Sequence, residues 1–323
     1  MELLKKLSLL YAPSGREKGI TDFIAGEVKA FADEVYTDNL GNLIAHKRGG
    51  GKKIMFAAHT DEIGVVVTFI DDKGYLRFSD VGGLYTKYLS GRRVIFANGT
   101  EGVIFTEPEN DKNRLLNMYI DIGAKTKEEA EKSVNVGDMA VFSGSFTEQN
   151  GIIIGKALDD RAGCYALIEA MKRVDSKNDL YFVFTTQEEV GLRGARTAAY
   201  GVDPDIAVAV DVTDTGDTPK SERVAVKMGD GAAVKVMDYS VICDSEVKNT
   251  LLRLSSQRGI KCQLEVMTEG GTDAGVIHFA RGGVKTGGIS IPTRYIHSPS
   301  EMIDKSDLEA VIDLVTAFAD EGC

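Results

Sequence analysis

The stretch YFVFTTQEEVGLRG, residues 181–194, joins an apolar segment directly to two adjacent acidic residues. Residues 181–184 have the length and composition of a buried β-strand. Glu188 and Glu189 follow, and adjacent side chains on an extended chain point to opposite faces. The two carboxylates therefore either have separate roles at the end of the strand or are only the polar start of a surface loop.

Strands and helices alternate in the first and last parts of the chain. Further buried strands are predicted at residues 54–58, at 206–210 and in the segment that ends at Ile291. Helices are predicted at residues 162–174, at 246–258, and in a final segment that Ser306 and Glu309 would open as a capping box. This alternation predicts an α/β fold with a central sheet flanked by helices on both faces.

The middle of the chain has a different pattern. Residues 66–154 carry repeated hairpin signals (DDKG, ANG, VGD and QNG) and one helical candidate, at 126–134. We therefore expect a small β-rich domain inserted into an α/β domain whose halves are residues 1–65 and 155–323.

Composition narrows the classes of function. The net charge of −11 disfavours binding to nucleic acid or to an anionic membrane. No apolar run approaches the roughly 18 residues that span a bilayer. The 4 cysteines are far apart and form no CxxC pair, which argues against a zinc finger or a disulfide framework. We expect a cytoplasmic protein with no nucleic-acid or membrane partner.

Each predicted strand is followed by a side chain that can bind a metal ion. These residues are His59 and Asp61, Glu188 and Glu189, Asp211, and His297, and two further acids, Asp159 and Asp160, precede the helix at 162–174. Ligand sites in open α/β sheets form outside the carboxyl ends of the strands. Residues far apart in the sequence are therefore expected to converge there.

Each signal is weak alone, because a histidine after a strand is more often structural and an aspartate before a helix is usually a cap. Together they form a nitrogen and oxygen ligand set without a thiolate, which suits zinc, cobalt or manganese. The other two histidines, His46 and His278, lack this context and are interpreted as structural.

Several motifs resemble one known family. They are HTDEIG (59–64), ALDDRAG (157–163), QEEVGLRGA (187–195), DVTDTGD (211–217), GGTDAG (270–275) and IPTRYIHSP (291–299). In their order they are similar to the cytosolic glutamyl-aminopeptidase and deblocking-aminopeptidase family, whose best-known members are the tetrahedral aminopeptidases. Some relatives carry an older endoglucanase label. The resemblance covers essentially the whole chain and implies a zinc-peptidase-like catalytic domain.

The resemblance implies a dinuclear metal-dependent aminopeptidase that removes N-terminal residues from short peptides. Two divalent ions, zinc or cobalt, would share the carboxylate of Asp159. His59 and Asp211 would complete one site, and Glu189 and His297 the other.

Three further acids have roles implied by the same resemblance. Glu188 would be the general base that acts on a metal-activated water. Asp61 would orient His59, and Asp160 would follow Asp159 through a cis peptide bond.

The substrate pocket is less well defined by the sequence. Thr272 and Asp273, in the GGTDAG loop, and Arg294 are candidate substrate-binding residues. The alternatives are a tight glycine turn for the loop and a structural ion pair for Arg294. Acidic, basic and neutral N-terminal preferences all occur in the family, so the preference of this chain stays open.

Two other expectations concern assembly and an alternative activity. By resemblance, the insert at 66–154 would be a dimerisation domain of a homo-oligomer, with dimers assembling to a dodecamer. The alternative function is an endoglucanase-type glycoside hydrolase. That chemistry needs two facing carboxyl groups and no histidine ligands, and the absence of tryptophan counts against a sugar-stacking cleft.

Overall fold

A large mixed sheet forms the centre of the protein. The computed structural model describes residues 1–108, 114–221 and 223–322. The sheet has 11 strands in the order β1-β2-β12-β3-β13-β16-β17-β11-β10, and β14 joins β15 to β16. Its strands are β1 (Glu34–Thr37), β2 (Leu43–Lys47), β3 (Lys53–His59), β10 (Thr147–Gln149), β11 (Ile152–Gly155), β12 (Asp179–Thr185), β13 (Ile206–Asp214), β14 (Ala232–Met237), β15 (Cys262–Val266), β16 (Lys285–Arg294) and β17 (Glu301–Asp304).

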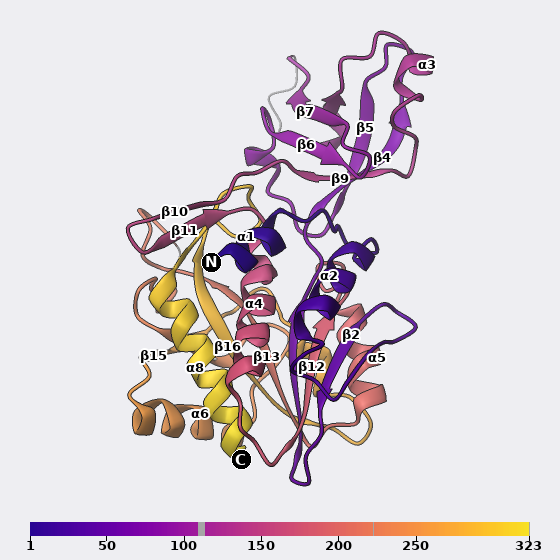
Figure 1. The fold of residues 1–323 in the computed structure, drawn as a ribbon. Coiled ribbons are helices and arrows are strands. Elements are labelled where there is room, and N and C mark those ends of the chain that lie inside the picture. The colour runs from indigo at the N-terminus through magenta and orange to yellow at the C-terminus, as the bar shows by residue number, and fades with distance from the viewer. Residues whose placement is uncertain (109–113, 222, 323) are drawn as a thin grey trace.

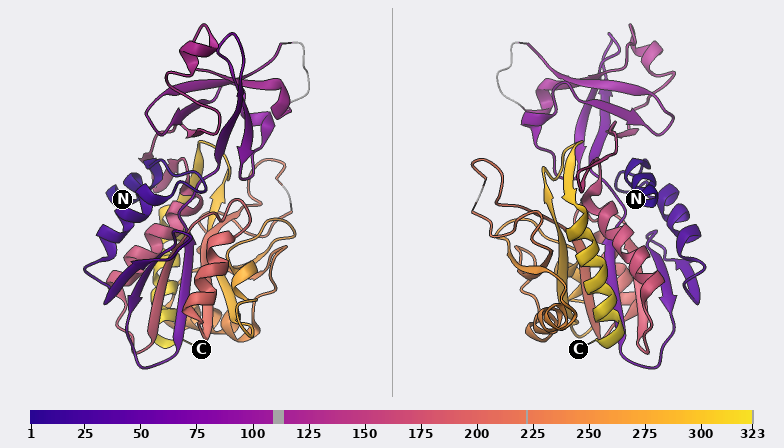
Figure 2. Two further views of the ribbon diagram at one scale, coloured as in Figure 1. Left: turned by 90° about the vertical axis from the view of Figure 1, so that its right-hand side faces the viewer. Right: turned by 60° about the vertical axis from the view of Figure 1, so that its left-hand side comes forward.

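The remaining strands close a small barrel in the order β4-β5-β8-β7-β6-β9. They are β4 (Gly64–Ile70), β5 (Leu76–Val81), β6 (Arg93–Phe96), β7 (Glu101–Thr106), β8 (Met118–Asp121) and β9 (Met139–Phe142). The barrel has its own apolar core. It lies beyond one end of the large sheet, at the top of Figure 1 and of both views in Figure 2.

Helices cover both faces of the large sheet. The helices are α1 (Glu2–Leu9), α2 (Lys18–Val28), α3 (Lys127–Ala130), α4 (Leu158–Arg173), α5 (Arg193–Val202), α6 (Ser245–Arg258), α7 (Ala274–Ile277) and α8 (Lys305–Glu321), with short 3₁₀ helices η1 (Thr86–Tyr88) and η2 (Leu115–Asn117). Phe56 of β3 packs in one core with α1, α2, α4, α6 and α8. Its neighbour Met55 points to the other face, in a core with α5 and α7. Among the described residues no helix is both long and apolar enough to cross a membrane.

The four strands predicted to be buried lie side by side in this sheet. β12, β3, β13 and β16 are parallel neighbours. Their carboxyl ends therefore meet at one edge: His59 at the end of β3 is in register with Thr185 of β12, and Asp211 of β13 with Ser290 of β16. This register brings the predicted ligands together.

Three local predictions differ from the structure. Asp304, not Ser306, caps α8, because its side chain accepts a hydrogen bond from the Ser306 N–H. The helix predicted at 126–134 is only the four residues of α3, where the side chain of Thr126 forms the cap. The hairpin of β10 and β11 belongs to the large sheet through β17, although all of it except Gly155 falls within residues 66–154.

Candidate metal centre and active site

The five predicted metal ligands and the predicted base line one cavity of about 560 Å³ at the carboxyl edge of the parallel strands. These residues are His59, Asp159, Glu188, Glu189, Asp211 and His297. They come from the end of β3, the turn after β12, the second half of β13, the start of α4 and the loop after β16. The predicted convergence of these side chains is present in the structure.

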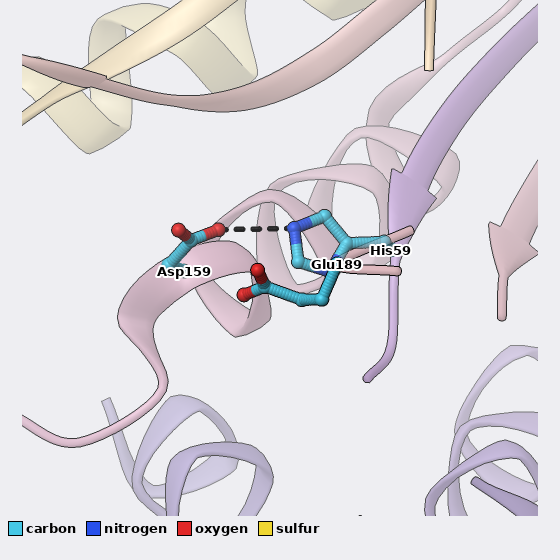
Figure 3. A group of neighbouring side chains, drawn as sticks. All are labelled: His59, Asp159 and Glu189. Carbon is cyan, nitrogen blue, oxygen red and sulfur yellow. Dashed lines mark hydrogen bonds and ion pairs between the residues drawn. The ribbon is translucent and has the colours of Figure 1, made fainter. Parts of the chain in front are cut away.

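Asp159 lies between the two histidines. Its Oδ1 is 2.9 Å from His59 Nε2, and its Oδ2 is 3.4 Å from His297 Nε2. Figure 3 shows the contact with His59 and the carboxylate of Glu189 turned toward the same space. One carboxylate thus offers a separate oxygen to each half of the site.

The other acids divide between these halves. Glu189 Oε2 is 3.2 Å from His297 Nε2. Asp211 Oδ1 and Glu188 Oε2 are each 3.9 Å from His59 Nε2. The adjacent glutamates therefore approach different histidines.

Ligand atoms of His59, Asp159 and Glu189 lie within 4.8 Å of one another, and those of His59, Asp160 and Asp211 do so as well. The carboxylate of Asp160, however, already accepts hydrogen bonds from the N–H groups of His59 (3.1 Å) and Gly163 (3.0 Å). We therefore interpret Asp160 as holding the backbone near His59 rather than as a ligand. The peptide bond between Asp159 and Asp160 is cis, as the resemblance implied.

Asp61 connects His59 to the two glutamates. Its Oδ1 is 3.6 Å from His59 Nδ1 and accepts the Glu188 N–H over 3.0 Å. Its Oδ2 accepts the Glu189 N–H over 3.2 Å and the Ser14 hydroxyl over 2.6 Å. This fully buried carboxylate holds the QEEVG turn beside His59, whose Nδ1 is also 3.2 Å from the backbone carbonyl oxygen of Asp61.

Glu301 is a site residue that the sequence reasoning missed. Its buried carboxylate accepts the backbone N–H of Asp159 and that of His297, each over 3.0 Å. It therefore ties together two chain segments that carry predicted ligands. Its position four residues after His297 was the only signal in the sequence.

The barrel also reaches the site through the glycine pair after β5. A Cβ atom at Gly83 would lie 3.0 Å from His297 Nδ1. One at Gly82, whose φ is +82°, would lie 3.1 Å from Glu189 Cβ. The VGG sequence was available as a signal, because glycine is needed where backbone approaches a side chain this closely.

The site gathers several acidic groups in a buried place. Burial raises the pKa of Glu188 well above its ordinary value, and burial raises the pKa of Asp211 to about 8. Burial lowers the pKa of the His59 imidazole, but the carboxylates of Glu188 and Asp159 outweigh it and the pKa is raised. The acids thus exceed the cations that the protein supplies here.

A bound divalent cation would fit this arrangement. Glu189 Oε1 is buried and has no hydrogen-bond partner among the described residues. Buried charges are normally paired or bound to a metal. Imidazole nitrogens and carboxylate oxygens are suitable ligands for zinc and its neighbours.

The three predicted substrate residues have different surroundings. Thr272 lines the cavity, and its buried hydroxyl has no partner among the described residues. Asp273 accepts the Thr185 hydroxyl over 2.6 Å. Arg294 forms a two-pronged ion pair with Asp217, over 3.0 and 2.8 Å. The roles of these residues in substrate binding stay predictions.

The other two histidines lie outside this cavity. His46 Nε2 is 2.7 Å from Asp179, and the ring stacks on Tyr181. His278 Nδ1 is 2.9 Å from the Ala274 carbonyl oxygen. These contacts are consistent with a structural role for both histidine rings.

Comparison with known proteins places this site in a family. The family model described as M42 glutamyl aminopeptidase matches residues 41–314. The chain belongs to the M42 glutamyl aminopeptidase family. It is an aminopeptidase, a hydrolase, and the family predicted from the motifs is confirmed. The chain is 52% identical to a putative aminopeptidase of Acetivibrio thermocellus, covering 97% of this chain and 96% of that protein.

Solved structures agree with this M42 assignment. An aminopeptidase of the archaeon Desulfurococcus kamchatkensis has a TM-score of 0.96 at 40% identity, covering 99% of this chain and 94% of its own. The TET1 peptidase of Pyrococcus horikoshii has a TM-score of 0.89 at 37% identity over 99% of both chains. A Thermotoga maritima neighbour is named an endoglucanase, at 37% identity and a TM-score of 0.86, covering 99% of this chain and 97% of its own. The match to the M42 family does not favour the glycoside hydrolase alternative.

Proposed function

We propose that this M42 protein is a dinuclear metal-dependent aminopeptidase that removes N-terminal residues from short peptides. The observation that carries the proposal is the position of Asp159, whose two oxygens lie 2.9 Å from His59 and 3.4 Å from His297. A carboxylate held between two histidines is the geometry that a shared ligand requires.

The ligand set follows from the two halves of the site. His59 and Asp211 would hold one divalent ion, and Glu189 and His297 would hold the second. Asp159 would bind both ions. When bound, such ions polarise the peptide carbonyl and lower the pKa of a water molecule. Zinc and cobalt are the proposed ions, because the set combines imidazole nitrogen with carboxylate oxygen.

Glu188 is the proposed general base. Its carboxylate lines the cavity 3.9 Å from His59 Nε2, and its backbone is held by Asp61. From there Glu188 accepts a proton from the attacking water and delivers it to the nitrogen of the leaving amine. Glu189, turned toward His297, is left to act as a ligand.

Metal removal tests the proposal. Dialysis against a chelator is expected to abolish hydrolysis of aminoacyl-p-nitroanilides, and zinc or cobalt should restore it. Metal analysis should find two ions per chain. Full activity after complete metal removal would contradict the proposal, as would cleavage of a cellulose analogue without peptide hydrolysis.

The substitution Glu188→Gln distinguishes the proposed role of Glu188 from that of Glu189. The variant should keep its metal content and lose roughly 10²- to 10⁴-fold in kcat, because only the proton transfer is removed. Glu189→Gln is the matched variant, and it should lose metal. Loss of both ions from Glu188→Gln would show that the assignment of the pair is wrong.

The proposed organisation is a catalytic part, residues 1–65 and 155–323, and a dimerisation part, residues 66–154, of which the β10–β11 hairpin joins the large sheet. The P. horikoshii relative is described as assembling into a tetrahedron or a large octahedral shell. The barrel region exposes large apolar side chains that a second chain would cover: Phe69, Tyr85, Tyr88, Phe105 and Leu116. Light scattering should find an oligomer of up to twelve chains, and Phe105→Glu should lower its mass. A monomeric wild-type protein would contradict this organisation.

The proposed location is the cytoplasm. The support is the absence of a cysteine pattern that a disulfide framework would need. Fractionation of the source cells checks this, and recovery of the protein only outside the cytoplasm would contradict it.

A further inference from the structure

Three charged side chains form a second cluster in the wall of the same cavity. Lys235 lies on β14, Glu265 on β15 and Asp238 in the turn after β14. All three line the cavity, and none is more than 3% exposed. Lys235 forms an ion pair with Glu265, and its Nζ is 3.5 Å from Asp238 Oδ2. We call this set the Lys235 cluster.

The backbone holds the Lys235 cluster in place. Lys235 and Glu265 are register partners on the parallel strands β14 and β15. The lysine side chain lies across Gly288 of β16, where an added Cβ would approach Lys235 Cβ to 3.0 Å. Such a pair links neighbouring strands, so it would stabilise the sheet even without a ligand.

Asp238 is held separately. Its Oδ1 accepts hydrogen bonds from the Ser240 N–H (2.8 Å), the Ser240 hydroxyl (2.7 Å) and the Val241 N–H (3.0 Å). The other oxygen is left to face Lys235. The turn thus supplies a second carboxylate that the cross-strand pair does not need.

The charges in the Lys235 cluster do not balance. Burial lowers the pKa of Lys235, but Glu265 and Asp238 outweigh it and raise the pKa, so the lysine stays charged. One ammonium then faces two carboxylates. Asp238 Oδ2 and Glu265 Oε2 are buried and have no hydrogen-bond partner among the described residues. A buried carboxylate oxygen without a partner is unfavourable, and a second cation would relieve it.

Other lining residues suit a long side chain with a charged end. Tyr239 and Met267 line the cavity and offer apolar surface on which an alkyl stem can lie. Glu269 adds a further acid to the lining. The lining therefore combines apolar surface with an excess of negative charge.

We infer that the Lys235 cluster receives the side chain of the substrate's first residue and selects a cationic one, lysine or arginine. This inference rests on the proposed aminopeptidase function and names the substrate class for the same cavity. The ammonium or guanidinium group of the substrate binds Asp238 Oδ2 and Glu265 Oε2, the two oxygens without a hydrogen-bond partner among the described residues. A glutamyl side chain instead meets an excess of negative charge.

Matched substrates isolate the effect of charge. Lysyl- and norleucyl-p-nitroanilide share an alkyl chain and differ in the terminal ammonium group. The ratio of their kcat/KM values should favour lysine by about tenfold or more, the scale of a hydrogen bond to a charged group. Glutamyl-p-nitroanilide should be the poorest of the three substrates.

Two variants test the assigned residues. Asp238→Asn and Glu265→Gln should each lower the lysine-to-norleucine ratio by about tenfold. A ratio within one variant cancels losses of folded protein or of metal, because these affect both substrates equally. Glu246→Gln is the control: this exposed acid on α6 pairs with Lys285 outside the cavity, and the ratio should not change.

The outcomes distinguish the inferred preference for a cationic residue from the proposed aminopeptidase function itself. Cleavage of norleucyl or glutamyl substrate at least as fast as lysyl would overturn the inference and leave the aminopeptidase function standing. No cleavage of any substrate by the metal-loaded protein would overturn the function itself. If a variant fails to fold, wild-type inhibition by free lysine and norleucine decides: equal inhibition overturns the inference, and at least tenfold stronger inhibition by lysine supports it.

Discussion

Asp61 accepts a hydrogen bond from the backbone N–H of Glu188 over 3.0 Å, across 127 positions of the sequence. The same carboxylate faces His59 Nδ1 at 3.6 Å. The residue proposed as base and a residue proposed as ligand are thus placed by one buried side chain.

Asp61→Asn is expected to lower both metal affinity and kcat/KM by roughly 10- to 100-fold, because an amide keeps one acceptor oxygen where the carboxylate uses two. Chelator competition and p-nitroanilide hydrolysis measure the two effects. Ser14→Ala removes only one hydrogen bond to Asp61 and should cost less. Equal losses in both variants would argue against the orienting role.

Glu301→Gln should weaken metal binding roughly 10- to 100-fold, because the variant keeps one acceptor for the N–H groups of Asp159 and His297. Titration with zinc against a competing chelator measures this affinity. Glu148→Gln, at an exposed ion pair with Lys305, is the control and should bind metal as the wild type does. Unchanged affinity in Glu301→Gln would remove Glu301 from the site.

Gly83→Ala should displace the His297 ring, because the added Cβ would lie 3.0 Å from Nδ1. We expect lower metal affinity and at least about tenfold lower kcat/KM, the lower end of losses from disturbed ligand orientation. Gly26→Ala on α2 is the control: nothing lies within 4 Å of its Cβ, and it should stabilise the protein by up to about 1 kcal/mol. Wild-type activity in Gly83→Ala would show that the close approach is tolerated.

The Asp217–Arg294 pair predicts a pH dependence of stability. Hydrogen bonding to Arg294 lowers the pKa of Asp217 from its usual 3.8 to about 2. A lowered carboxyl pKa contributes stability above the unfolded value and loses it as the pH falls from 3.8 toward 2. Asp217→Asn should therefore cost about 1 kcal/mol at pH 7, a figure reduced for partial solvation, and progressively less below pH 4.

Urea unfolding at pH 7, 5, 4 and 3 measures this difference. Asp230→Asn, at an exposed pair with Lys261, should change the free energy of unfolding by less than about 0.5 kcal/mol at each pH. A cost of Asp217→Asn that does not change between pH 7 and pH 3 would contradict the assignment of the pair.

Much of the fold and the site could be predicted before any tertiary contact was known. Apolar runs such as 181–184 are local signals of buried strands, and strand ends of a parallel sheet meet at one edge. That rule was enough to predict that His59, Asp211 and Glu189 would meet. The length of the helix predicted at 126–134 and the cap at Ser306 were wrong, because ends of helices depend on single hydrogen bonds.

Tertiary structure alone added Glu301 and decided which backbone groups the buried carboxylates hold. Asp61 and Glu301 act through hydrogen bonds to residues more than 120 positions away, and only strand register and loop paths bring such atoms within 3.0 Å. The Lys235 cluster has the same origin: Lys235 and Glu265 become neighbours only when β14 and β15 pair. The candidate ligand residues could be predicted from local sequence, whereas the partners that contact them follow from long-range packing.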